Sequence, residues 1–536
     1  MVATHVSPLE EGQTRLVSNA RRIMSMASGT AVSRATGLLR VLVLAWVLGF
    51  TQLSDAFNLA NTVPNMLFDI VLGGILSATF IPVFIERLAT DTERRAWRSI
   101  SNVVSAAVLL LFAASLLSWV GAPWIIQGFT FLQHTTSHRA QLALVEQESV
   151  ATQFLRWFVP QIFFYGIIGI ATGLLNIRKK FGVAAWAPVA NNVICIVVLI
   201  WFHLVDPTPT LRSLSNSSDL MWLGLGTTAG VAVQFLMLVP SLRRSQLGRL
   251  RFSMNLSDPA VRAVGRLGSW TLGVVATNQA SLYVVLSLAF ATGGNGPVSA
   301  YTYGWAFMQM PYAVIVISVL GVLTPQLAAL STEGKYVQLG EQLSKGLRQA
   351  MVIIIPCTFG LIVLSQPIVG ILLNHVHSNG HILAGTVLAI LAAGLPGFTL
   401  FQLCVRGLQA MQRARDVFVL YVLENALTVG LCWAIGRHSM AGLSASVSVA
   451  YTVSGLVAII ALHQYGVHVH RALIGVHVRR AVLASLIMAI VIAVVYAAST
   501  WSSGAGLVIR SAVAALAGGA VYLGFLLVTQ RRQRGV

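Results

Sequence analysis

The chain has 536 residues, of which 56% are hydrophobic and only 10% are charged, so it is a polytopic membrane protein and not an ordinary soluble domain. Its formal net charge of +19 would suggest a nucleic-acid partner in a soluble protein, but in a membrane protein the basic residues must first be counted loop by loop. The four cysteines lie in apolar runs without metal-ligand or CxxC spacing, so we expect neither a disulfide nor a metal site from them.

Apolar segments long enough to cross a bilayer recur along the whole chain. A hydrocarbon core of about 30 Å requires about 20 apolar residues per helix. The polar N-terminal segment lacks the apolar core and cleavage site of a secretory signal, so the first span should remain in the mature protein. We therefore expect an all-α fold with about fourteen transmembrane helices, near 24–50, 56–86, 101–127, 151–177, 183–204, 221–241, 267–292, 299–330, 347–374, 383–411, 416–436, 440–463, 481–499 and 505–529.

The basic residues fall almost entirely on one set of alternate loops, together with both termini. The opposite set of loops holds only four arginines, Arg139, Arg212, Arg437 and Arg510. Since Lys and Arg near helix ends are retained in the cytoplasm, this asymmetry predicts that both termini are cytoplasmic. It also accounts for nearly all of the positive charge, so no nucleic-acid partner is expected.

The second half of the chain repeats features of the first. The segment 55–88 resembles 299–330, and 172–193 resembles 406–427, where Gly, Leu and Asn recur at a constant offset. Parallel repeats of this kind form two pseudo-symmetric bundles, usually with the substrate between them. We expect a cytoplasmic tail at 1–22, six-helix bundles at 23–245 and 267–470, a basic linker at 246–266, two further helices within 471–530, and a cytoplasmic tail at 531–536.

Two arginines, Arg34 and Arg40, lie inside the first expected span. A guanidinium stays charged and is costly in hydrocarbon. Gly29, Ser33, Gly37 and Arg40 form one small and polar stripe, which must face protein or water. Arg34 lies about 120° around the helix from Arg40, so the two converge on one ligand only if the helix bends, for which Gly37 is a candidate hinge. The pattern favours an anion-binding cavity; the alternatives are a structural ion pair and an arginine that reaches the bilayer surface.

The second expected span carries a face of amides and an acid that lipid would not tolerate. Asn61, Asn65 and Asp69 follow helical spacing, and Pro64 loosens the backbone between them. We predict that this face lines a hydrated cavity and that Pro64 acts as a hinge. Asp55 and Asp69 are the expected partners of the two arginines. The alternative is polar bonding between packed helices, which contributes about 0.6–2 kcal/mol per contact.

The second half is polar in a different way. Gln309 lies among hydroxyl, amide and aromatic side chains, which suit a sugar or a peptide better than a phosphate. Arg406, Asp416, Glu424 and Asn425 are expected near membrane depth. Glu424 beside Asn425 could titrate or hold a coupling cation, and a buried ion pair between Glu424 and Arg406 is an equal alternative.

Motifs of soluble enzymes are missing from the sequence. There is no P-loop and no HExxH pattern, so we expect a transporter without a catalytic site or a metal cofactor. The histidines gather in loops at 375–381 and 463–477. A metal site is conceivable there, but a solvated loop is the favoured interpretation, because no single element shows ordered ligand spacing.

Several stretches together resemble one known family. "SRATGLLR", "DAFNLANTVPN", "GGILSATFIPVF", "WAPVANN" and "FMQMPYAVIVISVLGVLTPQL" resemble the MurJ/MviN lipid II flippases of the multidrug/oligosaccharidyl-lipid/polysaccharide exporter superfamily, over about residues 20–530. The last stretch is closer to the actinobacterial style of that family. The resemblance implies movement of an undecaprenyl-pyrophosphate-linked peptidoglycan precursor from the inner to the outer leaflet of the bacterial plasma membrane by alternating access.

The same resemblance implies a cationic central cavity, a groove for the lipid tail beside the last two helices, and partners that include lipid II, membrane lipids and proteins of cell-wall synthesis and division. Arg34, Arg40 and Asp55 match cavity positions of the family. Phe68 and Ala306 stand where many members carry a basic residue. Pyrophosphate would be solvated by guanidiniums in place of water. The energy source, whether Na⁺, protons or the membrane potential, stays open.

Two other functions remain as alternatives. The first is a cation-coupled drug exporter, which would favour acids in the cavity, or a polysaccharide-lipid exporter of the same superfamily. The second is a transport-inactive scaffold for cell-wall enzymes, suggested by the missing basic residues at positions 68 and 306.

Overall fold

The computed structural model is helical throughout the part of the chain that it describes. The described residues are 8–73, 81–133, 137–178, 180–214, 218–245, 250–253, 255, 258–373, 380–469, 475–499 and 504–534. Most of the 375–381 histidine loop, part of the 463–477 loop and the centre of the expected basic linker lie outside them. The described residues group into two compact units. Unit 1 comprises Met1–Val47, Ala60–Ile126 and Val145–Val275, and unit 2 comprises Leu48–Leu59, Gln127–Leu144 and Ala276–Val536.

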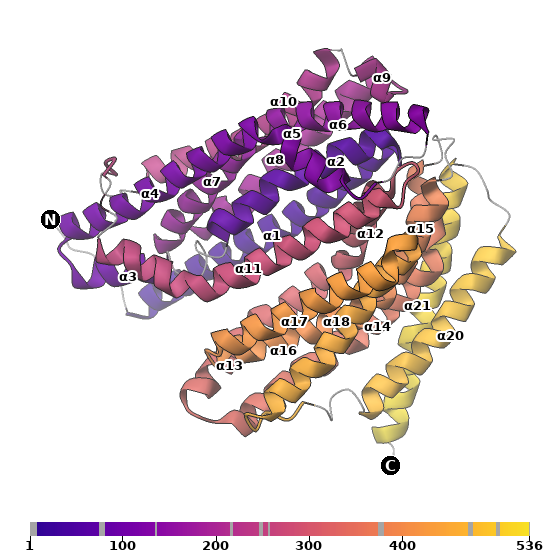
Figure 1. The fold of residues 1–536 in the computed structure, drawn as a ribbon. Coiled ribbons are helices and arrows are strands. Elements are labelled where there is room, and N and C mark those ends of the chain that lie inside the picture. Colours follow the sequence, from indigo (N-terminus) through magenta and orange to yellow (C-terminus); the bar gives the residue numbers. More distant parts are fainter. Residues whose placement is uncertain are drawn as a thin grey trace. The chain divides into compact units, whose positions relative to one another are not determined.

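Unit 1 is a bundle of long apolar helices (Figure 1). In it α8 packs along α10, and α7 packs on both α10 and α4. Ile168, Leu175, Val231 and Leu238 form a buried cluster there. Its elements, some of which continue into unit 2, are α1 (Pro8–Leu48), α2 (Gln52–Phe68), η1 (Asp69–Gly73), α3 (Ile81–Thr90), α4 (Glu93–Val120), α5 (Ala122–Thr130), α6 (His138–Phe158), α7 (Pro160–Ile177), α8 (Phe181–Val205), α9 (Leu211–Leu214) and α10 (Ser218–Arg243).

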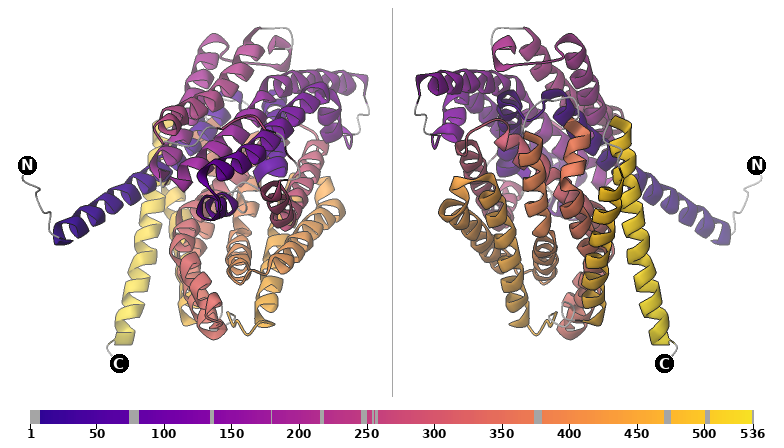
Figure 2. Two further views of the ribbon diagram at one scale, coloured as in Figure 1. Left: turned by 90° about the vertical axis from the view of Figure 1, so that its left-hand side faces the viewer. Right: turned by 90° about the vertical axis from the view of Figure 1, so that its right-hand side faces the viewer.

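Unit 2 contains a second bundle and a C-terminal helical hairpin. In the bundle α16 packs along α18, and α15 packs on α12 and α14. The hairpin of α20 and α21 packs on α14, and in both views of Figure 2 its two helices (yellow) run beside each other. The elements are α11 (Pro259–Ala291), which begins in unit 1, then α12 (Pro297–Pro311), η3 (Tyr312–Val316), α13 (Ile317–Thr332), α14 (Tyr336–Leu373), α15 (Gly380–Ala393), α16 (Leu395–Ala410), α17 (Ala414–Ala434), η4 (Gly436–His438), α18 (Met440–His463), α20 (Val476–Ala498) and α21 (Gly504–Arg534).

The hairpin buries its own apolar seam. Leu364 of α14 meets Met488 and Ile492 of α20 and Ala514 and Tyr522 of α21 in one buried cluster. The seam therefore joins the last two helices to the bundle of unit 2 largely through apolar contacts, and the Tyr522 hydroxyl adds a hydrogen bond to the carbonyl oxygen of Val352 in α14.

The expected all-α membrane fold is confirmed. Among the described residues, 12 helices are long and apolar enough to cross a membrane, or 13 if a bent pair counts as one span. The bent pair, Ile382–Ala393 and Leu395–Ala410, turns by 44° where the sequence predicts one span at 383–411. The bend falls at Gly394, where an added Cβ would lie 2.6 Å from the Ser448 hydroxyl, so α15–α16 and α18 approach closely. The remaining expected span, 56–86, contains residues 74–80, which lie outside the described residues.

A proline and a π-helical segment occur together in both repeats. Pro64 lies inside α2, which continues into η1, and Pro311 ends α12, which continues into η3. Proline removes a backbone donor, and π-helical turns are frequent at functional sites. The hinge role of Pro64 stays a prediction.

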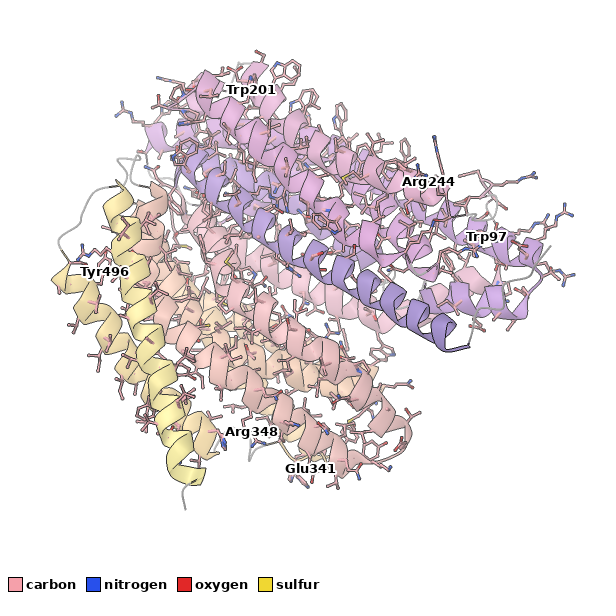
Figure 3. The ribbon with its side chains drawn as sticks, turned by 180° about the vertical axis from the view of Figure 1, so that it is seen from behind. Trp97, Trp201, Arg244, Glu341, Arg348 and Tyr496 are labelled. Atoms are coloured by element: carbon pink, nitrogen blue, oxygen red, sulfur yellow. The ribbon has the colours of Figure 1, made fainter. Side chains whose placement is uncertain are left out.

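Charged and aromatic residues mark the two ends of each bundle. In unit 1, Trp97 and Arg244 lie toward one end and Trp201 toward the other; in unit 2, Glu341 and Arg348 lie toward one end and Tyr496 toward the other (Figure 3). The basic residues of each unit that are labelled in the figure thus lie at the end that the loop charges assign to the cytoplasm.

Candidate substrate-binding site

The small residues of α1 pack against α8 within unit 1. A Cβ added at Gly29 would lie 2.6 Å from Cδ1 of Trp186, so the indole occupies the space that a side chain at this position would need. Trp186 Nε1 also donates a hydrogen bond of 3.2 Å to the carbonyl oxygen of Ser25. The N-terminal part of the polar stripe on α1, at Gly29, therefore faces protein.

One amide of α8 holds the next turns of α1. Asn192 Nδ2 donates to the carbonyl oxygen of Ser33 and to Oγ1 of Thr36, both at 3.1 Å. A Cβ at Gly37 would lie 3.5 Å from the same nitrogen, so this glycine allows the close approach. Asn192 thus fixes the rotation of α1 between its two arginines, and Gly37 contributes to a seam between two helices.

Arg40 continues this seam and is half-buried. Its charge acts on the Cys195 thiol and the Tyr165 hydroxyl of α8 and α7. Within the fully described part of α1, the candidate span is Ser28–Leu48. At 1.5 Å per residue, Arg40 lies about 12 Å from the nearer end of this span, at Leu48, too far for its side chain to reach that surface with ease.

Arg34 differs from Arg40 in how far it is covered. Its side chain is exposed, whereas Arg40 is half-buried. No ion pair between described residues includes Arg34 or Arg40; those pairs are Arg87–Asp91 and Lys335–Glu333. The expectation that Asp69 pairs with one of these arginines is therefore wrong in this structure.

The amide face of α2 lies partly uncovered. Asn65 is exposed and donates a hydrogen bond of 3.0 Å to the carbonyl oxygen of Asn61, one turn earlier. Asn61 and Asp69 are half-buried. Because a bare amide in hydrocarbon is costly, the exposed edge of this face requires water or a polar ligand.

Phe68 packs on Tyr165. The two ring centroids are 5.8 Å apart. Tyr165 also lies within the field of Arg40, so one side of the Arg40 surroundings is aromatic. Ala306 lies on α12, and Gln309, one turn further on the same helix, is half-buried.

Asp55 lies in a buried polar network inside unit 2. Its Oδ1 accepts hydrogen bonds of 2.7 Å from the backbone N–H and from the hydroxyl of Ser299, in the first turn of α12. The carboxylate is 1% exposed and caps the N-terminus of that helix. Asn58 and Tyr303 extend the network through hydrogen bonds of 3.0 Å. Asp55 was expected to pair with an arginine and to contact substrate; in this structure its hydrogen bonds go to α12 instead.

The acidic and basic residues of the second half do not form the expected ion pair. Glu424 is 2% exposed and accepts a hydrogen bond of 3.0 Å from Thr428. Arg406 is exposed and donates to Gln409 at 2.9 Å. The alternative of a buried Arg406–Glu424 pair is thus wrong, because the two side chains have other partners. Asn425, next to Glu424, donates to Asn278 Oδ1 at 2.7 Å.

Asp416 lies in the first turn of α17, close to the end of the candidate span Ala414–Ala434. Its Oδ2 accepts a hydrogen bond of 2.7 Å from the hydroxyl of Tyr465, in the turn after α18. This hydrogen bond raises the pKa of the Tyr465 hydroxyl. Asp416 therefore links the start of α17 to the turn after α18, and it is not part of the hydrogen bonds around Glu424.

Three residues of these networks were not predicted as contacts from the sequence. Asn192, Trp186 and Ser299 all make contacts that fix the helices carrying the candidate residues. A polar residue in the middle of an apolar span was the available signal for Asn192. Ser299 carried no signal of its own, because Ser near a helix start is common. Tyr303 belongs to the hydroxyl and aromatic side chains expected in the second half, and it bonds to Asn58. Among the described residues no group of three or more His, Cys, Asp or Glu could hold a metal ion.

The fold and the residues described above define a class of protein, a polytopic membrane transporter built from two helical units with charged and amide side chains on its spans. The family model "Lipid II flippase MurJ" matches residues 44–511 of this chain. The chain therefore belongs to that family of bacterial inner-membrane proteins. The lipid II flippase MurJ of Burkholderia cenocepacia is 26% identical over 467 residues, which cover 84% of each chain. A probable lipid II flippase MurJ of Rhizobium meliloti is 26% identical over 422 residues, covering 77% of this chain and 75% of the relative.

Solved structures agree on the fold. A lipid II flippase MurJ in an inward closed conformation aligns with a TM-score of 0.75 at 21% identity, over 95% of this chain and 99% of that one. An inward-facing multidrug resistance MATE transporter aligns with a TM-score of 0.63 at 14% identity, over 80% and 94%. The expected family is confirmed, and the wider superfamily shares the fold.

Proposed function

We propose that this chain moves lipid II from the inner to the outer leaflet of the bacterial plasma membrane by alternating access, with both of its termini in the cytoplasm. The family to which it belongs is named for this activity. Lipid II and the surrounding membrane lipids are the proposed partners, together with proteins of cell-wall synthesis and division.

One observation supports this function above the others. Arg40 is held about 12 Å from the nearer end of its candidate span by a packed seam and forms no ion pair with a described carboxylate. A permanent charge at this depth is costly unless it meets an anion or water. A pyrophosphate can accept parallel hydrogen bonds from a guanidinium, so the arginine replaces the water that the headgroup loses while it changes leaflet.

The exposed polar groups of unit 1 extend the proposed headgroup path. Arg34 and Asn65 are uncovered, while Asn61 and Asp69 are half-buried. On membrane helices, such groups are expected to line a water-filled cavity. Within unit 2, Gln309 is a separate candidate for a contact to the sugar or peptide part of the substrate, and the prenyl tail can remain in lipid beside α20 and α21.

The function is tested with the purified full chain in liposomes that contain lipid II. We expect the headgroup to become accessible to a membrane-impermeant labelling reagent faster than in protein-free liposomes. Uptake of an organic cation by the same liposomes, without movement of lipid II, would favour a drug exporter instead. Movement of neither would leave the scaffold as the better description.

A second proposal concerns the energy source. Glu424 is buried, bonded to Thr428, and forms no ion pair with a described basic residue. A carboxylate in this position is suited to bind a proton or Na⁺, because either would neutralise it.

If Glu424 carries the coupling ion, Glu424→Gln keeps an acceptor for Thr428 but removes the titratable charge. We expect the variant to translocate lipid II at a similar rate without a gradient, but to lose most of the acceleration that an imposed proton or Na⁺ gradient gives the wild type. Thr428→Val is the control for the hydrogen bond alone. An undiminished response to both gradients in Glu424→Gln would assign the coupling to another group or to the membrane potential.

A further inference from the structure

Two histidine side chains meet at the end of α18, away from the candidate substrate site. Nδ1 of His463 and Nδ1 of His468 are 2.6 Å apart, and the two ring centroids are 4.3 Å apart. Both residues are exposed. In the sequence they lie in a histidine-rich loop without ordered ligand spacing. The structure brings the two imidazoles together nevertheless.

The turn between them is a regular helix ending. Gly466 has a left-handed φ of 74°, and its N–H donates to the carbonyl oxygen of His463 at 3.0 Å. The N–H of Val467 donates to the carbonyl oxygen of Leu462 at 3.2 Å, and both of these apolar residues are fully buried. This is the Schellman arrangement, which fixes the backbone just after a helix. It returns the chain so that His468 faces His463.

The second histidine is also held from outside the turn. Ser344 of α14 donates a hydrogen bond of 3.3 Å to the carbonyl oxygen of His468. A Cβ added at Gly340 would lie 3.0 Å from the backbone nitrogen of His468, so α14 packs directly on this residue. The two imidazoles are therefore presented on a fixed backbone at both positions.

We propose that His463 and His468 form a binding site for a late first-row transition-metal ion, Cu²⁺, Ni²⁺ or Zn²⁺, through their two Nδ1 atoms. Metal–imidazole bonds are about 2.0–2.1 Å, which puts two nitrogens about 2.9 Å apart at a right angle and about 3.4 Å apart in a tetrahedron. From 2.6 Å, the rings need to separate by only a few tenths of an ångström for the right-angled geometry. Water would complete the coordination.

Charges of both signs lie near the histidine pair. His463 is in the last turn of α18, where the carbonyl groups carry the negative end of the helix dipole, which favours a cation. At Tyr465, between the two histidines, Asp416 accepts the hydroxyl hydrogen bond, while Arg413 lies 4.4 Å from the ring centroid and Arg415 is also close enough to act on the hydroxyl, so the two arginines oppose a cation there. Mg²⁺ and Ca²⁺ prefer oxygen ligands and should not compete for two imidazoles.

The site is tested by calorimetric titration of the tag-free full chain in detergent with CuCl₂, NiCl₂, ZnCl₂ or MgCl₂. We expect one ion to bind per chain, with Cu²⁺ tightest and Mg²⁺ not binding. His463→Ala and His468→Ala should each weaken binding about 10-fold or more, since even outer groups of metal sites contribute 10- to 100-fold. His477→Ala, an exposed histidine in α20, is the matched control and should bind as the wild type does.

The turn provides a second test that leaves both ligands in place. Gly466→Ala strains the left-handed position and should weaken binding several-fold, whereas Gly466→Asn, which tolerates this conformation, should retain most of it. In the wild type, the electron paramagnetic resonance spectrum of bound Cu²⁺ should show coupling to two nitrogens. Absence of binding to the wild type, or unchanged binding in the His463→Ala/His468→Ala double variant, would overturn the proposal.

Discussion

Replacing Arg40 by alanine is expected to slow lipid II translocation by about 10- to 150-fold. A hydrogen bond to a charged group contributes about 1.5–3 kcal/mol, and each 1.36 kcal/mol added to the barrier is a factor of ten in rate. Arg40 lies near mid-span in the seam with α8. Its guanidinium therefore does not reach the bilayer surface with ease, and it forms no ion pair with a described carboxylate that could replace the substrate. The measurement is headgroup accessibility in proteoliposomes with matched amounts of inserted protein.

Two further variants separate charge from geometry. Arg40→Lys keeps the charge but loses the planar fork, so an intermediate rate is expected. Arg34→Ala should have a smaller effect than Arg40→Ala, because Arg34 is exposed whereas Arg40 is half-buried. Arg139→Ala, an exposed arginine outside the candidate site, is the control and should leave the rate unchanged. A rate in Arg40→Ala equal to that in Arg139→Ala would remove Arg40 from the transport path.

Replacing Asp55 by alanine is expected to destabilise unit 2. The carboxylate accepts hydrogen bonds from the backbone N–H and the hydroxyl of Ser299, and all of these groups are buried. An unsatisfied buried donor costs about 1–3 kcal/mol, and loss of a helix cap costs about 0.5–2 kcal/mol. We therefore expect a clear decrease in the thermal unfolding temperature of the detergent-purified chain.

Comparison variants show which part of the network carries the effect. Asp55→Asn keeps an acceptor oxygen and should destabilise the protein less than Asp55→Ala. Ser299→Ala removes one hydroxyl but leaves the backbone cap, so its effect should be about 0.5–1.5 kcal/mol. If Asp55→Ala unfolds at the wild-type temperature yet loses transport, the carboxylate acts on substrate, as the sequence suggested, and the cap is not its main contribution.

Hydropathy predicted the helices well because, in lipid, a spanning segment must satisfy its own backbone groups and hide few charges. It could not show that the span at 383–411 bends at Gly394, since the bend depends on how closely α18 approaches. It also did not indicate that Leu48–Leu59 and Gln127–Leu144 belong to unit 2, because hydropathy carries no information about which helices pack together.

The candidate site was predicted less completely than the fold. Helical spacing correctly placed Gly29, Ser33 and Gly37 on one packed face of α1, because the period of the helix fixes that geometry. Spacing did not predict which side chains bond to each other. Asp55 bonds to Ser299 and not to an arginine, and Arg406 bonds to Gln409 and not to Glu424, although these opposite charges were expected at similar depths.

The most direct test of the role of Arg40 is a binding measurement on the detergent-purified chain. Lipid II and undecaprenol, which shares the prenyl tail but has no pyrophosphate, are compared for the wild type and for Arg40→Ala. We expect the wild type to bind lipid II at least about tenfold more tightly than undecaprenol, and Arg40→Ala to lose most of that preference, since one charge-assisted contact is worth about a factor of ten or more. An equal preference in the two proteins would contradict the proposal that Arg40 receives the anionic headgroup.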